Sequence, residues 1–265
     1  MTRAGTHAAA VTVALVAALG GHASAQRGGG PGRGGPPPTP RASAPIDLTG
    51  YWVSSVTEDW RYRMVTPPKG DYQGVPMTPE AVKVADAWDP AADEAAGEPC
   101  RSYGAPAIVR VPGRLHVTWQ DDRTLRVEAD AGTQTRLFRF GQPAPVGGAA
   151  SWQGESVAEW RTAGAARGRG PGGPAEPAPG NGSLKVVTRN LRPGYLRKNG
   201  VPYSASAVLT EYFSVTRRPS GDEWLVVVAV VEDPQYLRQP FVVSTHFRKQ
   251  ADAAGWDPTP CSATW

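Results

Sequence analysis

Histidine, cysteine and methionine are scarce in this chain of 265 residues, which contains four, two and three of them. His7 and His22 lie near the N-terminus, so His116 and His246 are the histidines left for acid–base or metal chemistry in the rest of the chain. The chain also lacks G-x-S-x-G, H-E-x-x-H and a glycine-rich phosphate loop between a strand and a helix. These absences exclude the common hydrolase, zinc-protease and nucleotide-binding signatures, and we expect neither a cofactor nor a metal.

Long apolar runs are absent too, since none reaches the about 20 residues that a membrane-spanning helix needs. A short apolar run at residues 8–19 follows Arg3 and precedes the small-residue sequence A-S-A, which ends just before Gln26. This order is typical of a secretory signal peptide, which we predict at residues 1–25, with a membrane anchor as the alternative. The mature protein is therefore expected to be periplasmic or secreted.

Residues 26–45 have almost nothing to bury, because they are mainly Gly, Pro, Arg and Ser. We predict a disordered linker there. Its arginines, Arg27, Arg33 and Arg41, suggest as an alternative a weak contact with the anionic cell envelope. Loss of Arg3 with the signal peptide would lower the net charge from +4 to +3, a modest excess that gives no support for nucleic-acid binding.

Residues 114–140 show the clearest pattern in the chain, an alternation of apolar and polar side chains with period two. Short polar residues or glycine at 121–122 and 131–132 suit tight turns. The segment is therefore predicted to form three antiparallel strands with one apolar and one polar face. The apolar face must be buried and the free edges must be paired, so further strands are required.

Further strand patterns follow at residues 151–162, 183–191, 205–217, 223–232 and 239–249. Residues 224–231 are apolar on both faces, so we expect a central strand that is covered on both sides. Residues 57–64 are also predicted to be a strand, and residues 163–182 a flexible loop rich in Gly, Ala and Pro. Together the patterns predict one all-β domain at residues 46–265, an antiparallel barrel of about eight to ten strands.

Gly50, Tyr51 and Trp52 form a G-x-W sequence at the start of the first predicted strand. This sequence resembles the signature of the lipocalin (calycin) family, in which the tryptophan packs across the closed end of a barrel against an arginine of the last strand. The resemblance implies a lipocalin-like barrel with structural roles for Trp52 and Arg248. The chain as a whole also resembles an uncharacterised family of exported bacterial proteins, and that resemblance implies no activity.

Residues 79–96 are predicted to form a short helical insert that lies over one mouth of the barrel. Thr78 can cap the first helix, which begins with a proline, a residue that suits the first helical position. This helix presents Val82, Ala85 and Trp88 on one stripe, and a second short helix follows it.

Cys100 and Cys261 are the two cysteines of the chain. A zinc site needs about four ligands, and no cluster of His or Cys lies near either residue in the sequence. We therefore predict one disulfide that joins the helical insert to the C-terminal tail, as suits an exported protein.

His116, Glu128 and Arg136 are the candidate catalytic residues. If the polar face of the three central strands lines the lumen, these side chains converge, with His116 as a base and Arg136 stabilising an oxyanion. If that face is outside, they are solvated, which is the usual arrangement in antiparallel sheets. Glu211 and Glu232 offer a second pair of carboxylates, although acidic residues are also common where a strand ends in a turn.

Aromatic side chains provide the candidate ligand-binding residues, which are Trp60, Tyr62, Trp119, Tyr212, Tyr236 and His246. The leading prediction is an exported protein that binds a small, largely apolar or aromatic ligand in the barrel. The alternatives are a cofactor-independent dehydratase, isomerase or cyclase on the same scaffold, and a structural protein that contacts the envelope. A lumen filled by side chains would argue against both binding and catalysis there.

Overall fold

The structure is a computed structural model that describes residues 36–141, 148–162 and 182–264. The chain divides into two compact units, Met1–Pro37 and Pro38–Trp265, and every element named below belongs to the second. The predicted signal peptide lies outside the described residues, as does the predicted flexible loop except for its last residue, Gly182.

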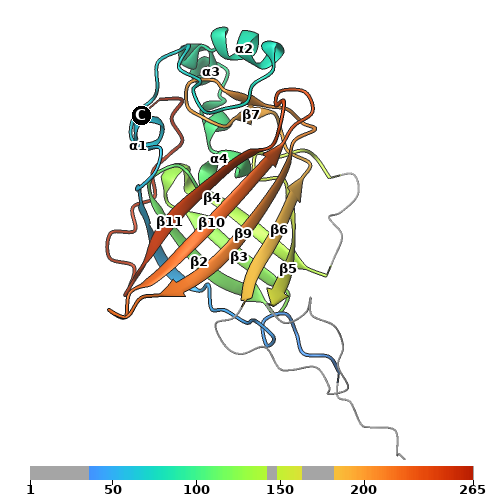
Figure 1. Ribbon diagram of the computed structural model, residues 1–265, viewed down its shortest axis with the longest axis vertical. Coiled ribbons are helices and arrows are strands. Elements are labelled where there is room, and N and C mark those ends of the chain that lie inside the picture. The colour runs from blue at the N-terminus through green and yellow to red at the C-terminus, as the bar shows by residue number, and fades with distance from the viewer. Residues whose placement is uncertain (1–35, 142–147, 163–181, 265) are drawn as a thin grey trace, which may run out of the picture. The chain divides into compact units, whose positions relative to one another are not determined.

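Nine strands form a closed barrel (Figure 1). In chain order they are β1 (Gly50–Ser55), β2 (Arg114–Asp121), β3 (Thr124–Ala129), β4 (Gln134–Phe140), β5 (Glu155–Thr162), β6 (Gly182–Arg189), β9 (Val208–Arg217), β10 (Glu223–Glu232) and β11 (Phe241–Gln250). The two-residue strands β7 (Gly194–Tyr195) and β8 (Pro202–Tyr203) pair with each other in a separate small sheet. The predicted fold class is confirmed.

The order of the strands around the barrel is β1-β11-β10-β9-β6-β5-β4-β3-β2. All neighbouring strands run antiparallel except β4 and β5. These two are parallel over a short stretch, in which residues 138–140 of β4 pair with residues 156–158 of β5. Strands that alternate in direction can close a ring only if their number is even. A ring of nine therefore requires at least one parallel pair, and the sequence patterns did not predict it.

The apolar face of the central strands β2, β3 and β4 lines the lumen. Leu115, Val117, Leu125 and Val127 are all buried, while the alternating polar residues between them are partly or fully exposed. Strand β10 follows the same alternation. Its inward side chains are buried and its outward ones are half-exposed. The prediction that this strand is covered on both sides is therefore correct for the inner side only.

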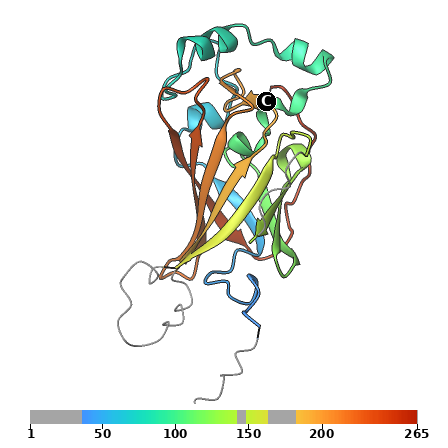
Figure 2. The ribbon, with the colours of Figure 1, turned by 90° about the vertical axis from the view of Figure 1, so that its right-hand side faces the viewer.

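One end of the barrel, called the upper end here, is closed by a cap that we define as residues 56–113 and 190–207 (Figures 1 and 2). The helices of the cap are α1 (Trp60–Arg63), α2 (Pro79–Asp86), α3 (Pro90–Ala95), the 3-10 helix η1 (Pro99–Ser102) and α4 (Ala105–Ile108). A second 3-10 helix, η2 (Ala131–Thr133), forms the turn between β3 and β4. All four residues of α4 are buried, and Ile108 belongs to the same apolar cluster as the lumen-facing residues of the barrel.

Helices α2 and α3 both lie within residues 79–96, and Thr78 caps the first of them. The Thr78 side chain accepts a hydrogen bond from the Ala81 amide at 3.2 Å, which satisfies one of the free N–H groups at the start of α2. Ala81, Ala85 and Trp88 are buried, but Val82 is 36% exposed. The buried stripe is therefore rotated from the predicted one towards Ala81.

Residues 57–64, predicted as a strand, contain the helix α1 instead. Strand β1 already pairs with β2 and β11 and ends at Ser55, so the following residues have no strand neighbour to supply hydrogen bonds. The Met64 amide instead donates a helical hydrogen bond to the Trp60 carbonyl at 2.8 Å, where a strand would form hydrogen bonds to a neighbouring strand.

Residues 38–49 form a segment at the lower end of the barrel that we call the strap. The Arg41 amide donates to the Asp122 carbonyl at 3.1 Å, and the Trp160 indole donates to the Pro40 carbonyl at 2.8 Å. Pro45, Ile46 and Leu48 of the strap are buried. Most of the strap falls in the predicted linker, and it is ordered because the barrel offers it both hydrogen-bond partners and an apolar surface.

Cys100 and Cys261 form a disulfide with an S–S distance of 2.04 Å, as predicted. The bond joins the cap to the C-terminal segment that follows β11, which runs back from the lower end to the cap (Figure 1). In the described part of the chain, no helix is long and apolar enough to cross a membrane.

Candidate functional site

The centre of the barrel holds a buried ion pair between Arg136 of β4 and Glu211 of β9. The guanidinium donates to both carboxylate oxygens, at 2.9 and 2.6 Å, and one of its nitrogens also donates to the Thr188 hydroxyl at 3.2 Å. The two residues are 3% and 0% exposed. A bidentate pair of this kind is among the strongest side-chain interactions, so the charge of the predicted catalytic residue Arg136 is already neutralised by Glu211.

Glu211 does not meet Glu232, with which the sequence analysis grouped it. Glu232 is exposed at the end of β10, whereas Glu211 lies inside the barrel. The two carboxylates therefore do not form an acid–base pair, and the turn interpretation of Glu232 holds.

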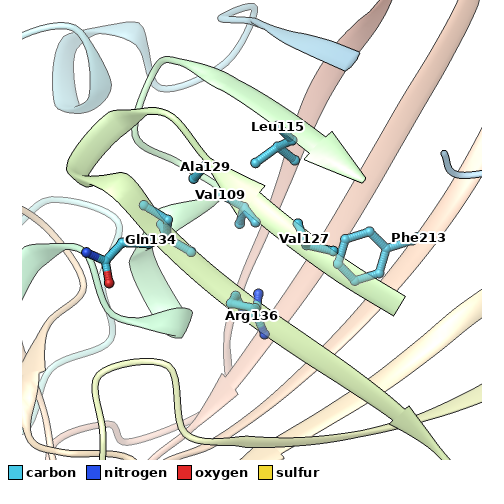
Figure 3. A pocket seen from close by; sticks show the side chains of 8 residues that line it. Val109, Leu115, Val127, Ala129, Gln134, Arg136 and Phe213 are labelled. Carbon is cyan, nitrogen blue, oxygen red and sulfur yellow. The ribbon is translucent and has the colours of Figure 1, made fainter. Parts of the chain in front are cut away.

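Side chains fill the lumen around this ion pair. A space of about 10 Å³ remains beside Arg136, lined by residues that include Val127, Gln134 and Phe213 (Figure 3). This is about the volume that one water requires, roughly 10–15 Å³, and far below the roughly 300–1,000 Å³ of a ligand pocket. The interior of the barrel is thus a packed core.

His116 and Glu128 lie on the outer face of the barrel. The His116 Nδ1 atom is 3.3 Å from the Glu128 carboxylate, and the His116 ring stacks on Tyr51 with 4.1 Å between centroids. Arg136 points into the barrel from the opposite face of the sheet. The three predicted catalytic residues therefore do not converge, because the polar face of the central strands is the outside.

His246 also lies on the outer face, near the junction of β1 and the cap. Its Nδ1 atom is 2.9 Å from the Thr57 hydroxyl and 3.1 Å from the Glu58 carboxylate. A hydroxyl–imidazole–carboxylate relay needs one ring nitrogen for each partner. Both contacts here use the same nitrogen, so the arrangement is a polar cluster and not a relay.

The other predicted ligand-binding residues are dispersed. Trp60 and Tyr212 are 66% and 37% exposed on the surface. Tyr62 donates a hydrogen bond to Asp71 at 3.1 Å in the cap, and Tyr236 packs against an apolar cluster that includes Met77 and Leu237. Of the six candidates, Trp119 alone lines a space of ligand size.

That space is a groove of about 730 Å³ at the lower end of the barrel. Its apolar lining comes from the strap and from the ends of β2 and β9, and consists of Ala44, Pro45, Ile46, Trp119 and Val215. Trp119 is held by an aromatic cluster with Phe140 and Trp160, whose centroids lie 5.6 and 6.4 Å from its own. The indole is therefore presented to the groove from a rigid base.

Polar and charged residues complete the lining of the groove: Arg41, Asp47, Thr49, Arg217 and Glu223. Arg217 and Glu223 pair with each other across the β9–β10 hairpin. Asp47 accepts hydrogen bonds from the Thr49 amide and hydroxyl at 2.9 and 2.7 Å, which fixes the turn of the strap. The charges of the lining are thus balanced, with two of each sign.

Trp52 is fully buried at the lower end, and its indole donates to the Leu48 carbonyl at 2.8 Å. The cation over its ring is Lys249, whose Nζ lies 4.4 Å from the centroid, and not Arg248. The register explains the difference, since Trp52 lies opposite Lys249 while Arg248 lies opposite Val53 and points outward. In β11 a shift of one residue moves the side chain to the other face.

The groove could not be predicted from the sequence because six of its ten lining residues lie in the strap. Residues 38–45 have the composition of a linker, and their hydrogen bonds with the β2–β3 turn and with Trp160 of β5 are made by backbone groups of the strap, which carry no sequence signal. Trp119 was found because it continues the apolar alternation of β2. The apolar residues Ile46 and Leu48, at the start of the predicted domain, are the local signal that the strap packs against the barrel.

Comparison of the chain with protein-family models, with curated proteins and with solved structures finds no match. The function is therefore argued from the site alone. Among the residues that the structure describes, no group of three or more His, Cys, Asp or Glu side chains is placed to hold a metal ion.

Proposed function

We propose that the protein binds a small, largely apolar or aromatic molecule in the groove between the strap and the lower end of the barrel. The observation that carries this proposal is the position of Trp119. Its indole lines a groove of about 730 Å³, which lies in the roughly 300–1,000 Å³ range of small-molecule sites. The lumen is packed, so the ligand has to bind in a surface groove. This groove is preferred to a second one of about 430 Å³, beside Tyr72, Met77 and Val82, because that groove has no indole in its lining.

The composition of the lining supports the same ligand class. An indole supported by two further aromatic rings favours stacking with a planar ligand. The balanced charges of Arg41, Arg217, Asp47 and Glu223 give no preference for a strongly charged ligand. They suit a molecule with a polar group at its edge.

Binding is favoured over catalysis because neither His116 nor His246 lines the groove. Its titratable residues are two arginines and two carboxylates, and Arg217 and Glu223 are already paired with each other. The arrangement thus offers recognition groups more readily than a poised acid and base.

Export and a lipocalin-like organisation belong to the same proposal. A disulfide suits an oxidising compartment, which supports a periplasmic or secreted location. The buried Trp52 with a cation over its ring, at the end of a closed barrel, supports the resemblance to lipocalins with Lys249 in place of Arg248. In this proposal the ligand site differs from an interior one, because it lies outside the packed lumen.

The test is a titration of the full chain with the neutral aromatic dye N-phenyl-1-naphthylamine, whose fluorescence rises in apolar surroundings. We expect saturable binding at one site per chain and a loss of affinity of at least about tenfold in Trp119→Ala. Ala44→Trp, which adds bulk to the groove without opening a cavity, should have the same effect.

Trp60→Ala is the matched control, since Trp60 is 66% exposed and lies in the cap at the other end of the barrel. Its affinity for the dye should equal that of the unmodified chain. Equal affinity in all four proteins would rule out the groove as the binding site.

A further inference from the structure

Three buried arginines come together in the cap, far along the sequence from one another. Arg63 belongs to α1, Arg110 follows α4, and Arg197 lies between β7 and β8. They are 2%, 4% and 5% exposed. The Arg63 Nε atom donates to the Arg110 carbonyl at 2.9 Å, and the guanidinium carbons of Arg110 and Arg197 lie 5.9 and 6.0 Å from the centre of the same ring, that of Phe241.

Each of these guanidinium groups has one nitrogen that the protein does not satisfy. Within the described part of the chain, Arg63 Nη2, Arg110 Nη1 and Arg197 Nε are buried and have no hydrogen-bond partner. Leaving a buried donor unpaired costs about 1–3 kcal/mol, and more for a charged group. All three arginines line one crevice, so a single acceptor bound there could lie close to all of them.

The local charge is also positive in excess. Arg63 pairs with Glu58, and Arg110 donates to Asp59 at 3.0 Å. Arg197 donates instead to the Gln73 carbonyl at 2.8 Å, and its guanidinium lies 4.0 Å from the centre of the Tyr62 ring. Two carboxylates are thus paired directly with three buried arginines.

Lys198 adds a fourth cation to the same space and is 5% exposed. Its Nζ donates to the Tyr103 hydroxyl at 2.7 Å and to the Ser262 carbonyl at 3.3 Å. Burial lowers the pKa of Lys198 to about 8, and burial together with Arg110 lowers the pKa of Arg197 to about 10. In both groups burial is the largest cause, and the nearby carboxylates, Glu94 for Lys198 and Asp59 and Asp71 for Arg197, act in the opposite direction.

The side chains surround a crevice of about 20 Å³, whose lining includes Arg63, Ser102, Arg110, Arg197 and Lys198. That volume is slightly above the roughly 10–15 Å³ needed for a single water, so a larger group has to move the surrounding side chains outward when it binds. Guanidinium groups present several N–H donors in a plane, a geometry that matches the oxygens of phosphate. We propose that this crevice is a binding site for a phosphate group, either free or carried by a larger molecule.

The site is separate from the groove. It lies in the cap at the upper end of the barrel, while the groove lies at the lower end, and no residue lines both spaces. Phosphate binding therefore does not depend on the proposed function, and either proposal can fail without the other.

The test is a titration of the full chain with inorganic phosphate, monitored by calorimetry and by thermal unfolding. Chloride keeps the ionic strength constant and serves as the reference anion. We expect saturable binding and a melting temperature that rises with phosphate but not with chloride, as binding to the folded state alone requires. Arg197→Met and Arg63→Met should each weaken phosphate binding by at least about tenfold. Phenyl phosphate serves as the second ligand, and tighter binding than that of inorganic phosphate would indicate an esterified ligand.

Arg161→Gln is the matched control, because Arg161 is an arginine with a 59% exposed side chain on β5 that pairs with Glu159. It should bind phosphate like the unmodified chain. If one arginine variant fails to fold, Lys198→Met removes a cation from the same crevice and should weaken phosphate binding in the same direction. The proposal is overturned if neither phosphate compound binds more strongly than chloride, or if the crevice variants bind phosphate as tightly as Arg161→Gln does.

Discussion

Replacement of Glu211 by leucine leaves the Arg136 guanidinium charged and unpaired at the centre of the barrel. The two residues share two short hydrogen bonds and are almost fully buried, so water cannot take the place of the carboxylate. Removal of one partner from a buried pair costs about 3–5 kcal/mol. That is a large part of the roughly 5–15 kcal/mol by which folded domains are stable.

The double variant Arg136→Met, Glu211→Leu should behave differently from either single change. It removes both charges and fills their space with apolar side chains beside Phe138 and Phe213, so its stability should equal or exceed that of the unmodified chain. The coupling free energy between the two positions should therefore be at least about 3 kcal/mol.

The assay is equilibrium unfolding in urea, followed by tryptophan fluorescence with the disulfide intact. Arg161→Gln, which breaks an exposed pair with Glu159, is the control and should change the free energy of unfolding by less than about 1 kcal/mol. The reasoning would be refuted if Glu211→Leu cost no more than this control, or if the double variant lost as much as the two single variants together.

Two further predictions concern the cap. Cys100→Ser with Cys261→Ser should lower the free energy of unfolding by about 2–5 kcal/mol, because the bond closes a loop of 161 residues, for which the chain-entropy model gives about 5 kcal/mol; an unchanged urea midpoint would contradict this. The second prediction concerns pH. Burial lowers the pKa of Lys198 to about 8 from 10.5, so between these values the unfolded chain binds more protons and the folded protein gains stability as the pH rises. The gain is on the order of 3 kcal/mol in phosphate-free buffer, and it should disappear in Lys198→Met; an equal slope in both proteins would show that Lys198 is not its source.

The barrel could be predicted from the sequence because period two is a strong signal wherever one face is buried. Leu115, Val117 and Leu125 belong to such an alternation, and the turns between them carry suitable residues. The same pattern does not state which face is inside. For antiparallel strands the apolar face is normally buried, and that rule places His116 outside, as observed.

The ion pair and the cationic crevice could not be predicted in the same way. Arg136 and Glu211 are 75 residues apart, and each falls at an inward position where an apolar residue is expected. Arg63 falls in residues 57–64, which were predicted as a strand and contain α1 instead, and nothing local indicates that it meets Arg197. Contacts of this kind depend on the closure of the barrel and on the path of the cap.

Arg248 shows that a difference of one residue in strand register decides which side chain contacts Trp52. The expected contact with Trp52 is made by Lys249, because the antiparallel pairing of β1 with β11 places that residue opposite the tryptophan. The sequence contains both cations side by side, and the register between strands whose paired residues, Trp52 and Lys249, are 197 positions apart is set by the whole barrel.

The most direct test of the proposed groove is hydrogen–deuterium exchange of the full chain with and without saturating N-phenyl-1-naphthylamine. If the dye binds between the strap and Trp119, amides in residues 38–49 and at the end of β2 should exchange more slowly when it is bound. The cap should be unaffected. Slower exchange in the cap with no change in the strap would contradict the account and would move the ligand site to the other end of the barrel.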